Sequence, residues 1–524
     1  MKTKATKLIN YFWNETFTAD LRSRLAFLLA VIGILVAIGV LLGGGLFRGS
    51  ASSAQTRDNV KPVGSPLAQS DNLWHDLDEQ RLSATAARQI VPSVYRTVSL
   101  DREALRALLA SAPLEFTSAA RHGQVVMTLP MPDGKLARFA IVESPMMEPG
   151  LAAKMPEFKS YRGQGIDDPT ATMRCDWSPA GFHATIIGAS GSVYFDPYAL
   201  NDTENYISYR KSDYRRSDET FSCGVDGEGV SVAGGLRNLT APEVTNGTTL
   251  RSYRLAMAAA GEYTAFHRQA GDTDDQAKTR AQTAMNVGVN RMNTVFERDL
   301  SVRLVVIANN LNIVYTNAAT DPYNGNDNAM ADQNQANLTT PGTIGGAAAY
   351  DIGHVVTTVG AGTAAAPSAC NDQQKAEGKS GGDNPVNDPF FIDMVTHEIG
   401  HQFGALHSYN GVDPGPMDGC TTRTANDAFE PSSGSTIMSY AGVCAVSNLQ
   451  RNADAMFSVR SLEVMVAYTN GGGACGTATA TGNTVPAVTA PASFNIPKGT
   501  PFTLTAVGND ANGDVLTYSW EQYN

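Results

Sequence analysis

The chain has 524 residues, with 39 Lys and Arg against 51 Asp and Glu, so its formal net charge is −12. This acidic balance argues against nucleic acid as the main partner, because binding to phosphates needs a basic face. Hydrophobic residues make up 42% of the chain, which excludes a largely disordered protein. At about 100–200 residues per domain, the length predicts roughly two to four domains.

The N-terminal region contains an uncharged, mostly apolar run at residues 25–47, and five basic residues precede it. A bilayer is spanned by about 20 apolar residues, and the positive-inside rule keeps the basic segment 1–24 in the cytoplasm. Small residues at 52–54 are of the kind that a signal peptidase accepts. The sequence leaves open a membrane anchor, a cleaved signal or a buried core helix. Either of the first two places the rest of the chain outside the cytoplasm, anchored or secreted.

Residues 48–90 are polar and are predicted to be a tether, with one short helix near 73–87. A β-rich domain is expected at 91–223, beginning with a helix at 101–110. Four alternating runs predict strands of this domain, at 124–129, 138–142, 183–187 and 192–195.

Residues 224–250 have the Gly-, Ser- and Thr-rich composition of a flexible linker. A second domain is expected at 251–478. Its predicted elements are a strand at 251–258, a helix at 275–300, strands at 304–308 and 352–358, and a helix at 389–406. Strands and helices in this order predict a mixed sheet covered by helices, so the fold class is α+β.

The C-terminal residues 479–524 are predicted to form a linker and then a β-hairpin of residues 502–507 and 515–520. This hairpin resembles the start of an Ig-like module. About 40 residues cannot make a stable sandwich alone, so we expect an incomplete module.

The strongest chemical signal is the segment HEIGHQFGALH at 397–407. On a helix, His397 and His401 project from one face about one turn apart, so both imidazoles can bind one ion. Gly404 allows the backbone to turn and bring His407 back as a third ligand. Three protein ligands leave one position free, which is typical of a catalytic zinc site. Glu398 would reach a water molecule at that position.

The segment STIMSYAG at 435–442 follows this helix. Together the two segments resemble the metzincin zinc metallopeptidases, in which an extended zinc helix precedes a Met-turn. The resemblance implies a zincin-like mixed sheet with a zinc-binding active-site helix, preceded by a β-rich prodomain. It also implies that Met438 packs beneath the three histidines. The cofactor is then Zn²⁺, and the substrate is a protein or peptide.

The cysteine placement is most similar to the bacterial type of the reprolysin/adamalysin-like branch. There, one cysteine upstream of the zinc helix pairs with one near the end of the domain, and two more pair around the Met-turn. The resemblance therefore implies the disulfides Cys370–Cys475 and Cys420–Cys444. From the residues alone, three pairings of these four cysteines are open.

Two residues depart from the reprolysin pattern. Ser408 follows the third histidine, where reprolysins usually have Asp. Tyr440 stands two residues after Met438, where astacin- and serralysin-like enzymes place a tyrosine that reaches the zinc. Tyr440 is either an auxiliary ligand or oxyanion stabiliser, or a packed tyrosine.

The function expected from these parts is zinc-dependent endopeptidase activity. Glu398 acts as general base on the metal-activated water and then protonates the leaving amine. The substrate would add as a strand beside the Gly-rich stretch at 359–366. The alternatives are a non-catalytic, zinc-stabilised surface adhesin and a zinc hydrolase of non-peptide amides. Calcium is a further candidate cofactor, since the Asp- and Asn-rich residues 320–334 could bind it or form solvated turns.

The β-rich domain at 91–223 stands where a propeptide would, and this predicts a zymogen. Cys223 begins a Cys-Gly-Val segment that resembles a cysteine switch, in which a thiolate occupies the open metal position. The flanking Phe221 and Ser222 match that pattern poorly. The sequence therefore favours a Cys175–Cys223 disulfide over the switch. In both cases the linker at 224–250 is the expected activation site.

Overall fold

The computed structural model describes residues 73–82, 88–122, 124–214, 223, 245–323, 329–411, 420, 423–489 and 495–523. The chain divides into compact units at 1–60 and 61–524, and the first lies outside the described residues. The predicted anchor or signal segment at 25–47 belongs to it. In the part that is described, no helix is both long and apolar enough to cross a bilayer.

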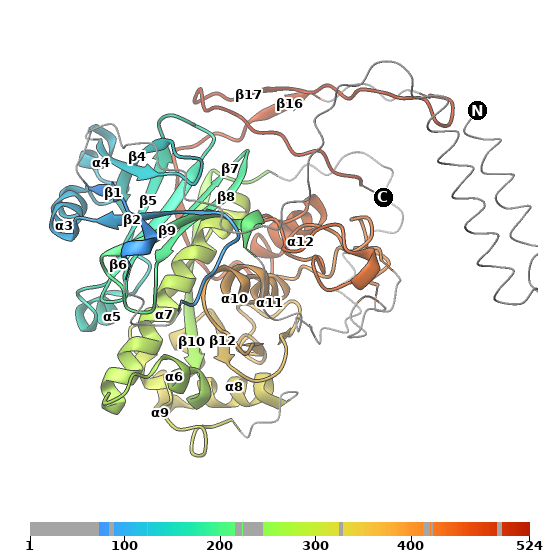
Figure 1. Cartoon of the computed structure of the whole chain (residues 1–524). Helices are drawn as coiled ribbons and strands as arrows, with labels where there is room; N and C mark the ends of the chain where they lie inside the picture. The colour runs from blue at the N-terminus through green and yellow to red at the C-terminus, as the bar shows by residue number, and fades with distance from the viewer. Residues whose placement is uncertain are drawn as a thin grey trace, which may run out of the picture. The chain divides into compact units, whose positions relative to one another are not determined.

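The β-rich region forms a nine-stranded antiparallel sheet in the order β1-β2-β9-β8-β7-β6-β5-β4-β3 (Figure 1). The strands are β1 (Trp74–Asp76), β2 (Tyr95–Leu100), β3 (Val125–Pro130), β4 (Leu136–Glu143), β5 (Lys159–Gly165), β6 (Thr172–Ser178), β7 (Gly181–Gly188), β8 (Gly191–Pro197) and β9 (Asn205–Arg210). Short helices join them: η1 (Glu79–Arg81), α3 (Arg102–Ser111), α4 (Ser118–His122), α5 (Pro149–Lys154) and η2 (Lys211–Asp213). Apolar side chains of this sheet and α3 form a core of their own.

The sheet begins before the boundary that the sequence predicts. Instead of a helix near 73–87, the described residues form strand β1 and the short 3₁₀-helix η1. The Trp74 ring lies 5.6 Å from the rings of both Phe182 and Tyr206. Because this indole is buried in the sheet core, the described residues 73–82 are part of the β-rich fold rather than of a tether.

The second region is a mixed sheet in the order β11-β10-β12-β14-β13, with β15 added antiparallel to β10. Its strands are β10 (Thr249–Ala259), β11 (Val302–Val306), β12 (Ile352–Thr357), β13 (Thr363–Ala364), β14 (Gly378–Gly381) and β15 (Thr477–Ala480). Strands β11, β10, β12 and β14 run parallel, while the edge strand β13 is antiparallel to β14. The predicted α+β class, with a β-rich region before a zincin-like sheet, is confirmed.

The main helices of the second region are α6 (Gly261–His267), α7 (Asp274–Val295), α8 (Met330–Thr339), α11 (Thr396–Gln402) and α12 (Val459–Thr469). Shorter segments are η3 (Phe296–Leu300), η4 (Asn310–Ile313), α9 (Pro341–Ile344), η6 (Ala347–Ala349), α10 (Asn387–Phe390), η7 (Phe391–Val395) and η9 (Ala445–Ser447). A capping box between Thr273 and Gln276 starts α7. This helix packs on β6 and β7 of the first sheet and on β11 of the second (Figure 1).

The β-rich region is joined to the second region by a buried interface. Met147 forms a parallel bridge with Val306, which extends the second sheet beyond its edge strand β11. Arg174 pairs with Glu297 at 2.8 Å, and Lys211 pairs with Asp393 at 2.6 Å. Apolar residues of the β-rich region share the core of the second region; they are Met146, Met147, Leu151, Met155, Phe158 and Ile187. The interface is therefore both apolar and ionic.

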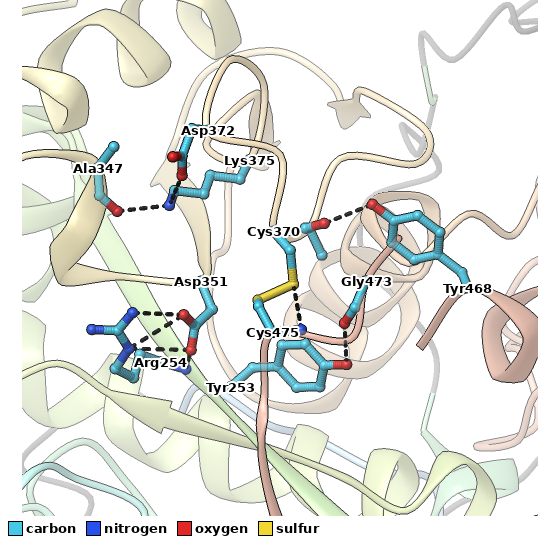
Figure 2. Close-up of a disulfide and its surroundings, with 11 residues drawn as sticks. Tyr253, Arg254, Ala347, Asp351, Cys370, Asp372, Lys375, Tyr468, Gly473 and Cys475 are labelled. Atoms are coloured by element: carbon cyan, nitrogen blue, oxygen red, sulfur yellow. Dashed lines mark hydrogen bonds and ion pairs between the residues drawn. A yellow bond between two sulfur atoms is a disulfide. The ribbon is translucent and has the colours of Figure 1, made fainter. Parts of the chain in front are cut away.

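A disulfide closes the end of the second region (Figure 2). Cys370 is bonded to Cys475, and Cys420 is bonded to Cys444, as the resemblance implies. Around the first bond, the Tyr253 hydroxyl donates to the Gly473 carbonyl at 2.6 Å. The segment after α12 is thereby fixed next to β10, where β15 completes the sheet.

The predicted C-terminal hairpin is wrong. Residues 515–520 form no strand, and β17 (Val507–Asn509) pairs instead with β16 (Ala487–Thr489). Val515 and Trp520 are 57% and 54% exposed. The alternating pattern of these residues therefore has no second layer of described residues to pack against, which explains why it does not form the expected pair.

Candidate metal centre

The zinc-helix segment brings its three histidines together. His397 and His401 lie on α11, and Gly404, at φ +98°, ends the helix so that the chain turns back toward His407. The Nε2 atom of His401 lies 3.1 Å from that of His397 and 3.2 Å from that of His407. The predicted helix at 389–406 is divided into α10, η7 and α11, and it stops at Gln402.

Backbone carbonyls fix the orientation of two of these rings. His397 Nδ1 donates to the Ile437 carbonyl, and His401 Nδ1 donates to the Ala405 carbonyl, both at 2.7 Å. Since a carbonyl only accepts, each Nδ1 carries the proton and each Nε2 carries a lone pair. Burial lowers the pKa of His397 to about 4. The histidines are therefore neutral near pH 7, which is the form that binds a metal.

The donor set fits zinc. Cys223, His397, His401 and His407 have ligand atoms that all lie within 4.8 Å of one another. In a tetrahedral site with Zn–N distances of about 2.0–2.1 Å, nitrogens are roughly 3.3 Å apart, which is close to the separations found here. Sulfur and imidazole are ligands typical of zinc.

Cys223 is not bonded to Cys175, so the disulfide that the sequence favoured is wrong. Cys175 is fully buried in β6, where burial raises the pKa of its thiol. The Sγ atom of Cys223 lies instead 3.4 Å from His401 Nε2, and its thiol donates to Glu398 Oε2 at 3.5 Å. A parallel bridge between Cys223 and Gly362 places this residue along the stretch at 359–366. The two cysteines belong to different environments, and only Cys223 reaches the metal centre.

Glu398 lies beside the histidines on α11 and is completely buried. Burial raises its pKa to about 8, while the Cys223 thiol and the Lys379 ammonium act in the opposite direction. Its Oε1 atom has no hydrogen-bond partner among the described residues. A cation held by the histidines would favour the ionised carboxylate, and the open Oε1 could then accept a proton.

Met438 and Tyr440 lie against the histidines from the segment at 435–442. Met438 is buried directly beneath α11, where a Cβ on Gly400 would come within 2.5 Å of its sulfur. The Tyr440 ring packs 4.7 Å from that of His407, and its hydroxyl donates to the Cys223 carbonyl at 3.2 Å. Tyr440 is thus a packed residue whose hydroxyl also points at a carbonyl group in the site.

Within the described residues 320–323 and 329–334, the structure gives no support to calcium binding. The Asp321 carboxylate accepts from the backbone amides of Gly261 and Tyr323, at 2.8 and 3.0 Å. The Tyr323 hydroxyl donates to Asn334 Oδ1 at 2.9 Å. Among residues with described positions, the cluster around Cys223 is the one group of His, Cys, Asp or Glu side chains with converging ligand atoms.

Two charged residues near the centre carry no sequence signal. Lys379 on β14 is 1% exposed, and burial lowers its pKa to about 8, although Glu398 raises it. Glu430 is 8% exposed and accepts a hydrogen bond from Ser408, the residue after the third histidine. Single charged residues in Gly- and Ser-rich segments are ordinary in a sequence, so only the fold shows that these two are buried.

Residues 249–467 match the model of the reprolysin-like metallopeptidase family M12B. The structure is similar to metalloproteinase-II from Bacteroides fragilis, with 10% identity and a TM-score of 0.37, over 70% of this chain and 96% of that one. A comparison with curated proteins finds no significant match. The family match covers the part of the chain that holds the three histidines and Met438.

Proposed function

We propose that the chain is a zinc-dependent endopeptidase that is made as a zymogen. The observation that carries this proposal is the convergence of three imidazole Nε2 atoms, the Cys223 sulfur and the Glu398 carboxylate. The family of residues 249–467 supports peptidase chemistry. We propose protein or peptide chains as the substrate.

Each residue of the site would have a separate role in peptide hydrolysis. His397, His401 and His407 would hold the zinc ion, which when bound activates water and polarises the scissile carbonyl. Glu398 accepts the proton of the attacking water and delivers it to the leaving amine nitrogen. Tyr440 donates a hydrogen bond to the carbonyl oxygen of the substrate, as it now does to the carbonyl of Cys223.

The zymogen proposal rests on Cys223. Its sulfur occupies the side of the histidines where a substrate carbonyl would enter, and its backbone pairs with Gly362 at the edge of the sheet. A thiol that coordinates a divalent ion is deprotonated and would be a tight fourth ligand. We propose that cleavage within residues 224–250 releases this contact.

We also propose that the folded part acts outside the cytoplasm. The two disulfides Cys370–Cys475 and Cys420–Cys444 favour an oxidising compartment. Whether residues 25–47 remain as an anchor or are removed as a signal stays a prediction, because they lie outside the described residues.

The test measures zinc content and peptide cleavage of the full chain together. We expect about one zinc per chain, little cleavage by the unaltered chain, and cleavage of a peptide library by the Cys223→Ser chain. Adding Glu398→Gln to Cys223→Ser should retain the zinc and lower kcat roughly 10²–10⁴-fold. Zinc binding without cleavage by any of these chains would contradict the peptidase proposal and favour the adhesin alternative.

A further inference from the structure

Glu430 joins the segment that carries the third histidine to the segment that carries the Met-turn. Its backbone amide donates to the Ser408 carbonyl at 2.8 Å, and the Ser408 hydroxyl donates to its carboxylate. On the other side, the backbone amides of Ser435 and Thr436 donate to Oε1 at 2.8 and 3.0 Å. The Thr436 hydroxyl donates to Oε2 at 2.6 Å. One buried carboxylate thus links two segments that are separate in sequence.

Both linked segments lead directly to the metal centre. Ser408 follows His407, and its amide donates to the Met438 carbonyl at 3.0 Å. Thr436 precedes Ile437, whose carbonyl orients the ring of His397. For His407, no carbonyl or carboxylate contact to the ring is found among the described residues. Its ring packs against that of Tyr440, and its backbone neighbour Ser408 is bonded to the Met-turn and to Glu430.

We propose that Glu430 is a positioning residue of the metal centre, which fixes His407 against the Met-turn through its bonds to Ser408 and to residues 435–436. This inference rests on the proposed function. The sequence has serine at 408, where reprolysins usually have Asp. In this chain the carboxylate at that place is that of Glu430, which accepts a hydrogen bond from the Ser408 hydroxyl. Partners behind metal ligands typically contribute about 10–100-fold to metal affinity.

The test is the zinc affinity of the full chain, measured by competition with a chelator. Glu430→Ala should weaken zinc binding by roughly 10–100-fold. Glu430→Gln keeps one acceptor for the two amides and should weaken it less. Combining Ser408→Asp with Glu430→Gln returns a carboxylate to the same cluster and should restore part of the loss. The visible spectrum of the cobalt(II)-loaded chain, which reports ligand geometry, should shift in Glu430→Gln.

The matched control is Asp427→Asn, in the same loop, because the Asp427 carboxylate accepts from Arg460 at 2.8 Å. This variant should leave the zinc affinity and the cobalt spectrum unchanged. Unchanged zinc affinity and cobalt spectrum in Glu430→Gln would overturn the inference, as would equal losses in Asp427→Asn. If Glu430→Ala does not fold, Glu430→Gln and its combination with Ser408→Asp still test the positioning role. If the unaltered chain binds no zinc, the proposed function fails as well; a zinc-binding chain with insensitive Glu430 variants refutes the positioning role alone.

Discussion

The β-rich region contacts the second region in two places that differ in kind. At the metal centre the contact is small: one sulfur, one carbonyl and one backbone bridge, all of Cys223. Behind the centre the contact is broad, with buried ion pairs, a strand-like addition at β11 and a shared apolar core. The difference agrees with the zymogen proposal, in which the broad interface would hold the β-rich region in place and the small contact would block the site.

The largest effect is expected at the broad interface. Lys211 pairs with Asp393 at 2.6 Å and with Asp388 at 3.1 Å, and all three are buried. Lys211→Met would leave two carboxylates without their cation, so the free energy of unfolding should fall by about 3–5 kcal/mol. Urea denaturation of the full chain measures this loss.

The matched control adds Asp388→Asn and Asp393→Asn to Lys211→Met. Removing both charges should recover most of the lost stability, because a neutral buried group costs less than an unpaired charge. Equal stability of Lys211→Met and the unaltered chain would show that this ion pair does not hold the two regions together.

The second prediction concerns pH. Burial opposes ionisation of Glu297, but Arg174 and Arg303 outweigh it and lower the pKa of this carboxyl below its ordinary value of 4.5. A lowered pKa stabilises the fold above pH 4.5, and the contribution is lost as the pH falls through the pKa of the folded state. At pH 7, Glu297→Gln should cost about 1.5–3 kcal/mol.

Parallel urea titrations from pH 7 to pH 3 check this sign. The difference between the unaltered chain and Glu297→Gln should shrink steadily below pH 4.5. A difference that stays constant, or grows toward acid pH, would mean that the ionised carboxylate does not stabilise the interface.

The third prediction concerns the small contact. Cys223→Ser should raise peptide cleavage by the full chain at least about tenfold. This corresponds to a loss of roughly 1.4 kcal/mol in the free energy with which Cys223 blocks the site. The free energy of unfolding should change by less than about 0.5 kcal/mol, because the broad interface is untouched. Cys175→Ser is the matched control and should leave cleavage unchanged. If the Cys223→Ser chain binds zinc and remains silent, the broad interface itself is the block.

The smallest effect is expected for an ion pair that is exposed. Arg138 and Asp167 lie 2.6 Å apart, but their side chains are 54% and 40% exposed. Arg138→Ala should cost no more than about 1 kcal/mol, and added salt should reduce the difference. If Arg138→Ala and Lys211→Met lower the free energy of unfolding equally, burial does not explain the expected difference between the two ion pairs.

The convergence of the three histidines could be predicted from sequence because these residues are close together in the chain. His397, His401 and His407 lie within one short segment, where helical spacing and a glycine turn determine their geometry. Met438 follows from its position after that helix. The two disulfides of the second domain were implied by the family pattern, and the structure forms the same pairs.

The position of Cys223 could not be predicted in this way. It is set by contacts with residues far along the chain, such as Gly362 and His401, and not by its neighbours. Pairing the two cysteines that remain after the other disulfides favoured Cys175 as its partner. That argument does not consider where the fold buries each thiol. The ion pairs of Lys211 and Arg174 likewise join distant segments and show no local pattern.

The predicted boundaries of helices and strands are wrong where tertiary packing overrides the local sequence pattern. Trp74 makes its segment a strand by burial among aromatic rings. The zinc helix is interrupted by the π-helical segment η7, which includes Asp393, the partner of Lys211. At the C-terminus, an alternating pattern without a packing partner formed no hairpin.

The central claim is that the Cys223 sulfur blocks the metal site. Its most direct test is X-ray absorption at the zinc edge of the full chain. The account predicts three nitrogen ligands and one sulfur at about 2.3 Å, with the sulfur absent from a folded Cys223→Ser chain. A zinc site with only nitrogen and oxygen ligands in the unaltered chain would contradict it.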